Sequence, residues 1–81
     1  MTVRLLYFAS FREAAGTDEE TRSLAEGTTV GALWEELRAG LPYFAKFVSM
    51  PAAAVNCEYV SAARTLADND EIAFLPPVAG G

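Results

Sequence analysis

The first residues of the chain are mostly hydrophobic and of types that favour a strand. Residues 2–8 are rich in β-branched and aromatic types, which predicts a strand. Neighbouring side chains of a strand point to opposite faces, and Arg4 is expected to face water. The side chains then expected to face the core are Val3, Leu5 and Tyr7. Those expected on the outer face with Arg4 are Leu6 and Phe8.

Residues 71–75, just before the tail, predict a final strand. Its inward side chains are Ile72 and Phe74, and its outward ones are Glu71, Ala73 and Leu75. Before it, short strands are predicted at 53–55 and 59–60, joined near Asn56. Residues 68–70 have the composition of a turn.

One clear helix is predicted between these strands, over residues 29–39. Its apolar residues recur with the period of one helix face, and they are Val30, Leu33, Trp34 and Leu37. Thr28 or Thr29 is the expected N-cap, and Gly40 is the expected C-terminal stop. Trp34 is therefore expected in the core.

Three other segments carry weaker signals. Residues 10–15 are compatible with a short helical turn, with Ser10 as its cap and Glu13 completing a capping box. Residues 19–24 are a candidate for a polar second strand that forms a hairpin with the first. Residues 41–51 contain two prolines and are expected to be irregular.

The order of these elements favours an α+β fold, in which a mixed sheet packs on one main helix. This is the ubiquitin-like β-grasp arrangement, whose first and last strands lie parallel at the centre of the sheet. The length of 81 residues suits a single domain. We expect the β-grasp domain over residues 1–75 and an extended tail over residues 76–81.

Charge and composition exclude several classes of function. The net charge is −5, and the six basic residues are scattered, which argues against binding nucleic acid. The single cysteine, Cys57, rules out an intrachain disulfide and fits a cytoplasmic protein. No segment has the composition of a signal peptide or a membrane-spanning helix.

The tail has features suited to entering a narrow channel. Two prolines cannot extend a sheet ladder and favour an extended exit from the domain. Small residues follow, and glycine at the end leaves no Cβ to obstruct access. The tail residues are Pro76, Pro77, Val78, Ala79, Gly80 and Gly81. Extended, six residues span about 20 Å. The carboxyl group of Gly81 is therefore the candidate reactive group, although many glycine-containing termini have no function.

The sequence resembles the small subunit of molybdopterin synthase, the MoaD family, over nearly its whole length. The tail is the most specific part of this resemblance. Further matching residues are Tyr7-Phe8-Ala9, Arg12-Glu13, Gly16-Thr17-Asp18, Thr29-Val30, Ala53-Ala54-Val55-Asn56, Val60-Ser61, Leu66, Asp68, Asp70-Glu71 and Ala73-Phe74. The helix and residues 38–51 resemble the family least.

This resemblance implies a sulfur carrier with no bound cofactor or metal. An E1-like adenylating enzyme uses ATP to activate the carboxyl group of Gly81, and a sulfur donor converts the adenylate to a thiocarboxylate. The tail then enters the large subunit of molybdopterin synthase and donates sulfur to precursor Z, which forms the molybdopterin dithiolene. The carrier itself is a sulfur-donating subunit without a catalytic centre of its own.

The outer face of the sheet is the candidate surface for such a partner. The first and last strands are expected to be neighbours, so their outward apolar residues form one patch. Its residues are Leu6, Phe8, Ala73 and Leu75, with Tyr59 as a possible addition. The alternatives are that loops of the chain cover these side chains, or that the strand parity is wrong by one residue.

Other polar residues give little sign of independent catalysis. Cys57 has no histidine partner, because the chain has no histidine, and Ser10 and Ser61 lack a base. A group of three carboxylates is expected to form a solvated loop rather than a cation site. These are Asp68, Asp70 and Glu71. Glu35 and Glu36 are expected on a solvated helix face.

Three alternative functions remain open at this point. The first is a related sulfur carrier for thiamin or another thiolated product. The second is a ubiquitin-like modifier joined through Gly81 to a target lysine. The third is a binding module whose tail is inert.

Overall fold

The first and last strands of the chain lie side by side at the centre of one sheet. The computed structural model describes residues 1–77 and has a five-stranded sheet in the order β2-β1-β5-β3-β4. β1 (Thr2–Tyr7) and β5 (Glu71–Leu75) pair in parallel. The other strands pair antiparallel and are β2 (Glu19–Ser23), β3 (Ala52–Val55) and β4 (Glu58–Val60). The predicted β-grasp arrangement is confirmed.

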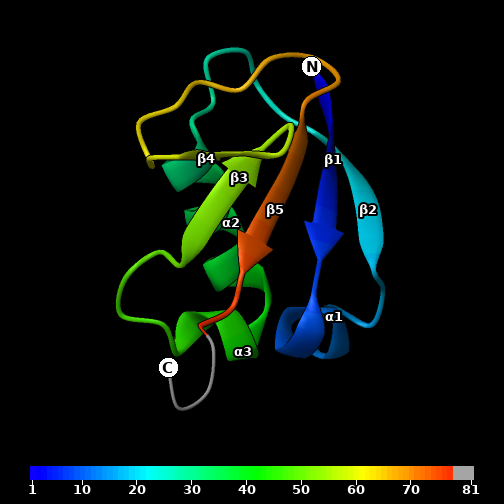
Figure 1. Cartoon of the computed structure of the whole chain (residues 1–81), viewed down its shortest axis with the longest axis vertical. Coiled ribbons are helices and arrows are strands. Elements are labelled where there is room, and N and C mark those ends of the chain that lie inside the picture. The colour runs from blue at the N-terminus through cyan, green and yellow to red at the C-terminus, as the bar shows by residue number, and fades with distance from the viewer. Residues whose placement is uncertain (78–81) are drawn as a thin grey trace.

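Figure 1 shows one helix, α2 (Val30–Gly40), behind the sheet. The shorter helices α1 (Ala9–Ala15) and α3 (Pro42–Ala45) lie at the lower end, below the last residues of β1 and β5, and the N-terminus lies at the upper end. The outer face of the sheet is turned towards the viewer, and no helix of residues 1–77 covers it. None of the helices in this part of the chain is long and apolar enough to cross a membrane.

The buried residues confirm the predicted parity of both central strands. The inward side chains of β1 and β5 are all at most 2% exposed, and they are Val3, Leu5, Tyr7, Ile72 and Phe74. The predicted stripe of α2 packs against them. Trp34 is buried, with its ring centroid 5.1 Å from that of Phe74 and 5.5 Å from that of Phe44. The expectation that Trp34 belongs to the core is confirmed.

Helix α2 begins and ends within one residue of the bounds predicted from the sequence. The Oγ1 atom of Thr29 accepts a hydrogen bond from the N–H of Ala32 at 3.1 Å, so Thr29 rather than Thr28 is the N-cap. Gly40 is the last helical residue instead of the stop. The C-cap is Leu41, which is extended because a proline follows and disfavours helical backbone at the preceding residue.

The predicted cap of α1 is wrong. Helix α1 begins one residue earlier than expected, and Ser10 lies inside it. The N-cap position is Phe8, which forms no side-chain cap hydrogen bond, and its carbonyl oxygen accepts from the N–H groups of Phe11 and Arg12. Burial of Phe11 in the core therefore matters more for this helix than a polar cap does.

The segment 41–51 is not wholly irregular, because α3 occupies its first half. Pro42 stands in the first turn of this helix, where its missing N–H costs no hydrogen bond. Phe44 is fully buried, and its ring centroid lies 4.9 Å from that of Phe11. This aromatic contact between distant segments explains a short helix that local sequence did not indicate.

The turn at residues 68–70 is present, but Asp70 is not solvated as expected. The residue is 7% exposed, and its carboxylate accepts hydrogen bonds from Asn56 Nδ2 at 2.9 Å and from the N–H of Ala67 at 2.8 Å. Asn69 donates its N–H to the carbonyl of Thr2 at 2.7 Å. Together these bonds tie the start of β1, the β3–β4 turn and the start of β5 to one another.

Candidate partner interface and tail root

A row of apolar side chains crosses the outer face of the sheet. Leu6 on β1 lies opposite Ala73 on β5. Ala73 lies opposite Ala54 on β3, and Ala54 opposite Tyr59 on β4. Because paired residues of adjacent strands present their side chains on the same face, these four form one continuous band.

A second row lies nearer the tail. Leu75 is paired with Ala52, and Phe8 follows directly after β1. Phe8 is 46% exposed and Tyr59 is 77% exposed, whereas Leu6, Ala73 and Leu75 are half-buried. We call the two rows together the outer patch; its members are Leu6, Phe8, Ala52, Ala54, Tyr59, Ala73 and Leu75.

The structure therefore brings together all five residues predicted for the partner surface. Their outward orientation is confirmed, and their role in binding a partner stays a prediction. The sequence interpretation missed Ala52 and Ala54. The available signal was their alternation with the buried residues Ala53 and Val55 on the same strand.

A groove of about 680 Å³ continues the outer patch to the root of the tail. It is lined mostly by apolar residues from four separate segments, namely Ala9, Phe47, Ser49, Met50, Pro51, Ala52, Tyr59, Leu75, Pro76 and Pro77. The last residue of β5 and the first two residues of the tail thus help to line the groove. The predicted tail residues Val78, Ala79, Gly80 and Gly81 lie outside the described residues.

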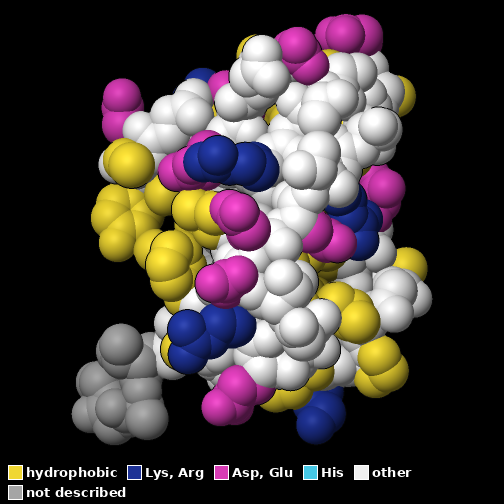
Figure 2. Space-filling view, turned by 90° about the vertical axis from the view of Figure 1, so that its right-hand side faces the viewer, with side chains coloured by type: hydrophobic (Ala, Val, Ile, Leu, Met, Phe, Trp, Pro, Cys, Tyr) yellow, Lys and Arg dark blue, Asp and Glu magenta, His cyan; other side chains and the backbone are white. Residues whose placement is uncertain are grey.

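Charged side chains border the apolar surface. At the end of the sheet away from the tail, Arg4 forms an ion pair with Glu71 across the β1–β5 pair. Figure 2 shows hydrophobic side chains gathered along its left-hand edge, where the outer face is seen side-on, with acidic and basic groups around them. An apolar centre with a polar rim is the usual composition of a protein–protein interface.

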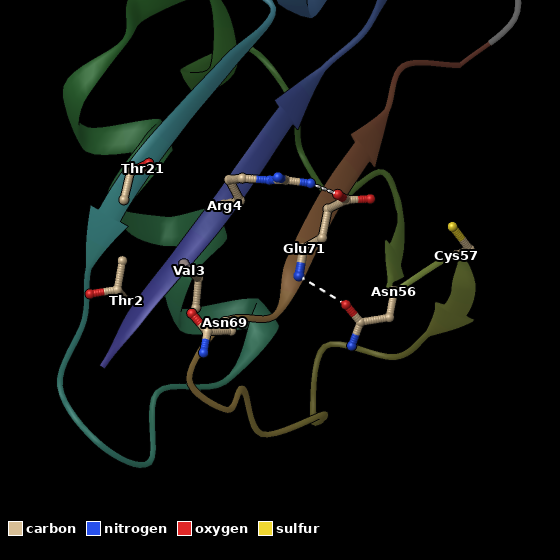
Figure 3. Close-up of a pocket in the computed structure, with 8 residues that line it drawn as sticks. All are labelled: Thr2, Val3, Arg4, Thr21, Asn56, Cys57, Asn69 and Glu71. Carbon is tan, nitrogen blue, oxygen red and sulfur yellow. Dashed lines mark hydrogen bonds and ion pairs between the residues drawn. The ribbon is translucent and has the colours of Figure 1, made fainter.

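Cys57 stands apart from the outer patch. It is exposed, lies in the β3–β4 turn with φ of 71°, and borders a hollow of about 540 Å³ with Arg4, Asn56 and Glu71. Figure 3 shows Arg4 directed towards Glu71, and the Oδ1 atom of Asn56 facing the N–H of Glu71, a hydrogen bond of 3.0 Å. Arg4 and Asn56 are thus both engaged with Glu71.

Tyr7, the last residue of β1, links this strand to β2 through its side chain. The hydroxyl of Tyr7 donates a hydrogen bond to Glu20 on β2 at 2.5 Å. Burial raises the pKa of Tyr7, and the hydrogen bond and negative charge of Glu20 raise that pKa further. The phenol is therefore held neutral and is unsuited to act as a general base. Within residues 1–77, no three His, Cys, Asp or Glu side chains are placed to hold a metal ion.

Comparison with known proteins agrees with this geometry. The ThiS family matches residues 5–81. The molybdopterin synthase sulfur carrier subunit of Escherichia coli (strain K12) is 41% identical over 81 residues, covering 98% of this chain and 99% of that protein.

Two solved structures show the same fold. The small archaeal modifier protein 1 of Methanosarcina acetivorans has a TM-score of 0.78 at 28% identity, covering 99% of this chain and 96% of that one. A chain in the complex of subunits 1 and 2 of the molybdopterin-converting factor from Helicobacter pylori has a TM-score of 0.69 at 21% identity, with 100% of both chains covered. At that identity the second likeness concerns the fold only.

Proposed function

Because this chain belongs to the ThiS family, we propose that it is the sulfur carrier subunit of a molybdopterin synthase and that Gly81 carries the sulfur. The observation that carries most weight is the full-length match to a sulfur carrier subunit at 41% identity. The structure supports the proposal because β5 ends directly in Pro76 and Pro77, beside an apolar surface. The domain would then hold a partner while the tail reaches into it.

The chemistry follows from the weakness of a carboxylate as an electrophile. A terminal carboxyl group has a pKa of about 3.3–3.7 and is ionised near neutral pH. Adenylation by an E1-like enzyme joins the Gly81 carboxyl group to AMP and releases pyrophosphate from ATP. A sulfur donor then displaces AMP, and the resulting thiocarboxylate is a soft sulfur nucleophile. The single cysteine, which allows no intrachain disulfide, fits the reducing cytoplasm, and we place the carrier there.

The large subunit of the synthase is the partner that we assign to the outer patch. Burying a large apolar side chain contributes about 1.5–3 kcal/mol. Phe8 and Tyr59 are the most exposed large members of the patch, and Leu75 adjoins the tail. These three residues are expected to supply most of the docking energy.

Intact-mass measurement tests the proposed function. The protein is incubated with ATP, an E1-like adenylating enzyme and a sulfur source. We expect one oxygen to be replaced by sulfur, with the change located at Gly81 by fragmentation. A chain shortened to end at Ala79 is the control and should stay unmodified. Sulfur found on Cys57 with Gly81 unchanged would refute the proposal.

A protein modifier is the second candidate function, favoured by the 28% identity to an archaeal modifier protein. It differs in the acceptor of the activated carboxyl group, which would be a lysine of a target protein. Conjugates that survive denaturing electrophoresis and form without any sulfur source would support it.

A further inference from the structure

One edge of the sheet, formed by β2, pairs with no further strand in residues 1–77. β2 is the last strand in the sheet order and pairs with β1 alone. Figure 1 shows β2 along the right-hand side of the molecule, and Figure 2 faces that side, where backbone and uncharged polar side chains form much of the surface. The backbone N–H and C=O groups of such an edge can pair with a further strand.

Alternate residues of β2 direct their backbone groups to this edge. The carbonyl of Asp18, just before the strand, accepts from the N–H of Tyr7 on β1 at 2.9 Å. Since backbone groups alternate in direction along an antiparallel strand, every second residue after Asp18 also bonds to β1. The residues between them therefore present their N–H and C=O groups at the edge, and they are Glu19, Thr21 and Ser23.

The first of these three residues is already bound within the chain. The hydroxyl of Thr17 donates to the carbonyl of Glu19 at 2.9 Å and accepts from its N–H at 3.4 Å. A carbonyl oxygen has two lone pairs, so the carbonyl of Glu19 can still accept from a further strand.

The sequence of β2 is complementary to itself in one antiparallel register. Two identical edges related by a two-fold axis run antiparallel, with edge-facing residues opposite one another. When Thr21 lies at the axis, Glu20 lies opposite Arg22 of the second copy, and Thr21 lies opposite its own counterpart. Pairs of both kinds stabilise adjacent strands. With the axis at the residue before or after Thr21, two glutamates or two arginines are directly opposed, which is destabilising.

The side chains of Glu20 and Arg22 retain groups for this pairing. Both are partly exposed, and Arg22 Nε lies 3.3 Å from Glu20 Oε1 within the strand. The hydroxyl of Tyr7 donates to the same oxygen. These bonds do not use Oε2 of Glu20 or the two terminal nitrogens of Arg22, so these groups can form ion pairs between two copies.

We propose that two copies of this chain associate edge to edge through β2, in antiparallel register about Thr21. The two five-stranded sheets then join into one continuous sheet. Because the two-fold axis is normal to the sheet, the outer patches of both copies lie on the same face. Each copy contributes a strand of five residues, which is small for a stable interface, so the association is expected to be weak.

Sedimentation equilibrium of the full-length chain tests the proposal. The average mass should rise from that of one chain towards that of two as the concentration approaches about 1 mM. Arg22→Glu places two glutamates opposite each other on both sides of the axis and should weaken association at least tenfold. Arg64→Glu is the control, because it changes the net charge equally at an exposed loop residue and should leave association unchanged.

A second charge-reversed variant tests the register. Arg22→Glu has glutamate at both charged positions of the pair, and Glu20→Arg has arginine at both. Neither should associate alone, whereas an equimolar mixture should form a mixed dimer, because each glutamate then lies opposite an arginine. Recovery in the mixture would show that the loss is not caused by the missing hydrogen bond from Tyr7. If Glu20→Arg does not fold, the comparison of Arg22→Glu with Arg64→Glu still decides.

Three results would overturn the proposal. The first is no association at about 1 mM, which would leave the edge to a strand of a different protein. The second is equal association of Arg22→Glu and the unaltered chain. The third is association that Leu75→Glu abolishes, which would place the contact on the outer patch. None of these measurements uses ATP or a sulfur source, so the proposed function stands or fails independently of them.

Discussion

The central strand pair, β1 and β5, has a polar end and an apolar end. At the end near the N-terminus, polar groups of β1, β5 and the β3–β4 turn bind one another, and Asp70 is the buried centre of these bonds. At the tail end, the surface is apolar and partly exposed. The first end holds the strands together, whereas the second offers area that a partner can bury. If the apolar end docks a partner as proposed, stability and docking depend on separate residues.

The largest effect should follow from Asp70→Ala, which tests the polar end. The substitution leaves the amide of Asn56 and the N–H of Ala67 without an acceptor. Both donors belong to exposed residues that water can reach, so the free energy of unfolding should fall by about 1–3 kcal/mol. Urea unfolding measures this change, and Asp70→Asn should cost less because one acceptor remains. Affinity of the folded protein for the large subunit should not change.

Leu75→Glu tests the apolar end and should have the next largest effect. It removes an apolar side chain of the outer patch and places a charge beside the tail root. Affinity for the large subunit should fall at least tenfold, which corresponds to about 1.4 kcal/mol. A binding titration measures it, with circular dichroism on the same sample as a check of folding. Unchanged affinity in a folded variant would place the interface elsewhere.

Removing the hydroxyl of Tyr7 should have a smaller effect on the free energy of unfolding, and this effect should depend on pH. Tyr7→Phe removes the hydrogen bond to Glu20 and should lower stability by about 0.5–1.5 kcal/mol near neutral pH. The folded state raises the pKa of Tyr7, so the unfolded chain releases this proton first as pH rises. The stability due to Tyr7 is therefore present below its unfolded pKa of about 10 and is lost at higher pH. Unfolding of the two proteins from pH 8 to 11 should show a shallower decline for Tyr7→Phe.

Much of the fold could be predicted from the sequence because local pattern and final packing agree. Alternation in β1 and β5 determines which side chains face the core, and Thr29 caps α2 as its residue type predicts. Helix α3 could not be predicted, because Phe44 is buried by aromatic residues distant in the sequence. The burial of Asp70 could not be predicted either, because its sequence neighbours are polar and charged. Its partner, the amide of Asn56, is distant in the sequence.

The candidate site could likewise be predicted only in part from the sequence. Strand parity located five of the seven patch residues, because orientation along a strand is a local property. The groove at the tail root joins four segments of the chain and includes Phe47 and Met50, so it exists only in the folded protein. Local pattern carries no information about such a surface.

Cys57→Ser should have the smallest effect, and it tests whether the hollow at the polar end takes part in sulfur transfer. Cys57 is exposed and lies at the opposite end of the central strand pair from the tail root, beside Arg4 and Glu71, which are paired with each other. The chain has no histidine to activate its thiol. Stability should change by less than about 0.5 kcal/mol, as for most surface substitutions. Thiocarboxylate formation on Gly81 should proceed at the starting rate, measured by intact mass over time. A folded variant that forms it several times more slowly would make Cys57 a participant in sulfur transfer, and the polar end would then have a chemical role as well as a structural one.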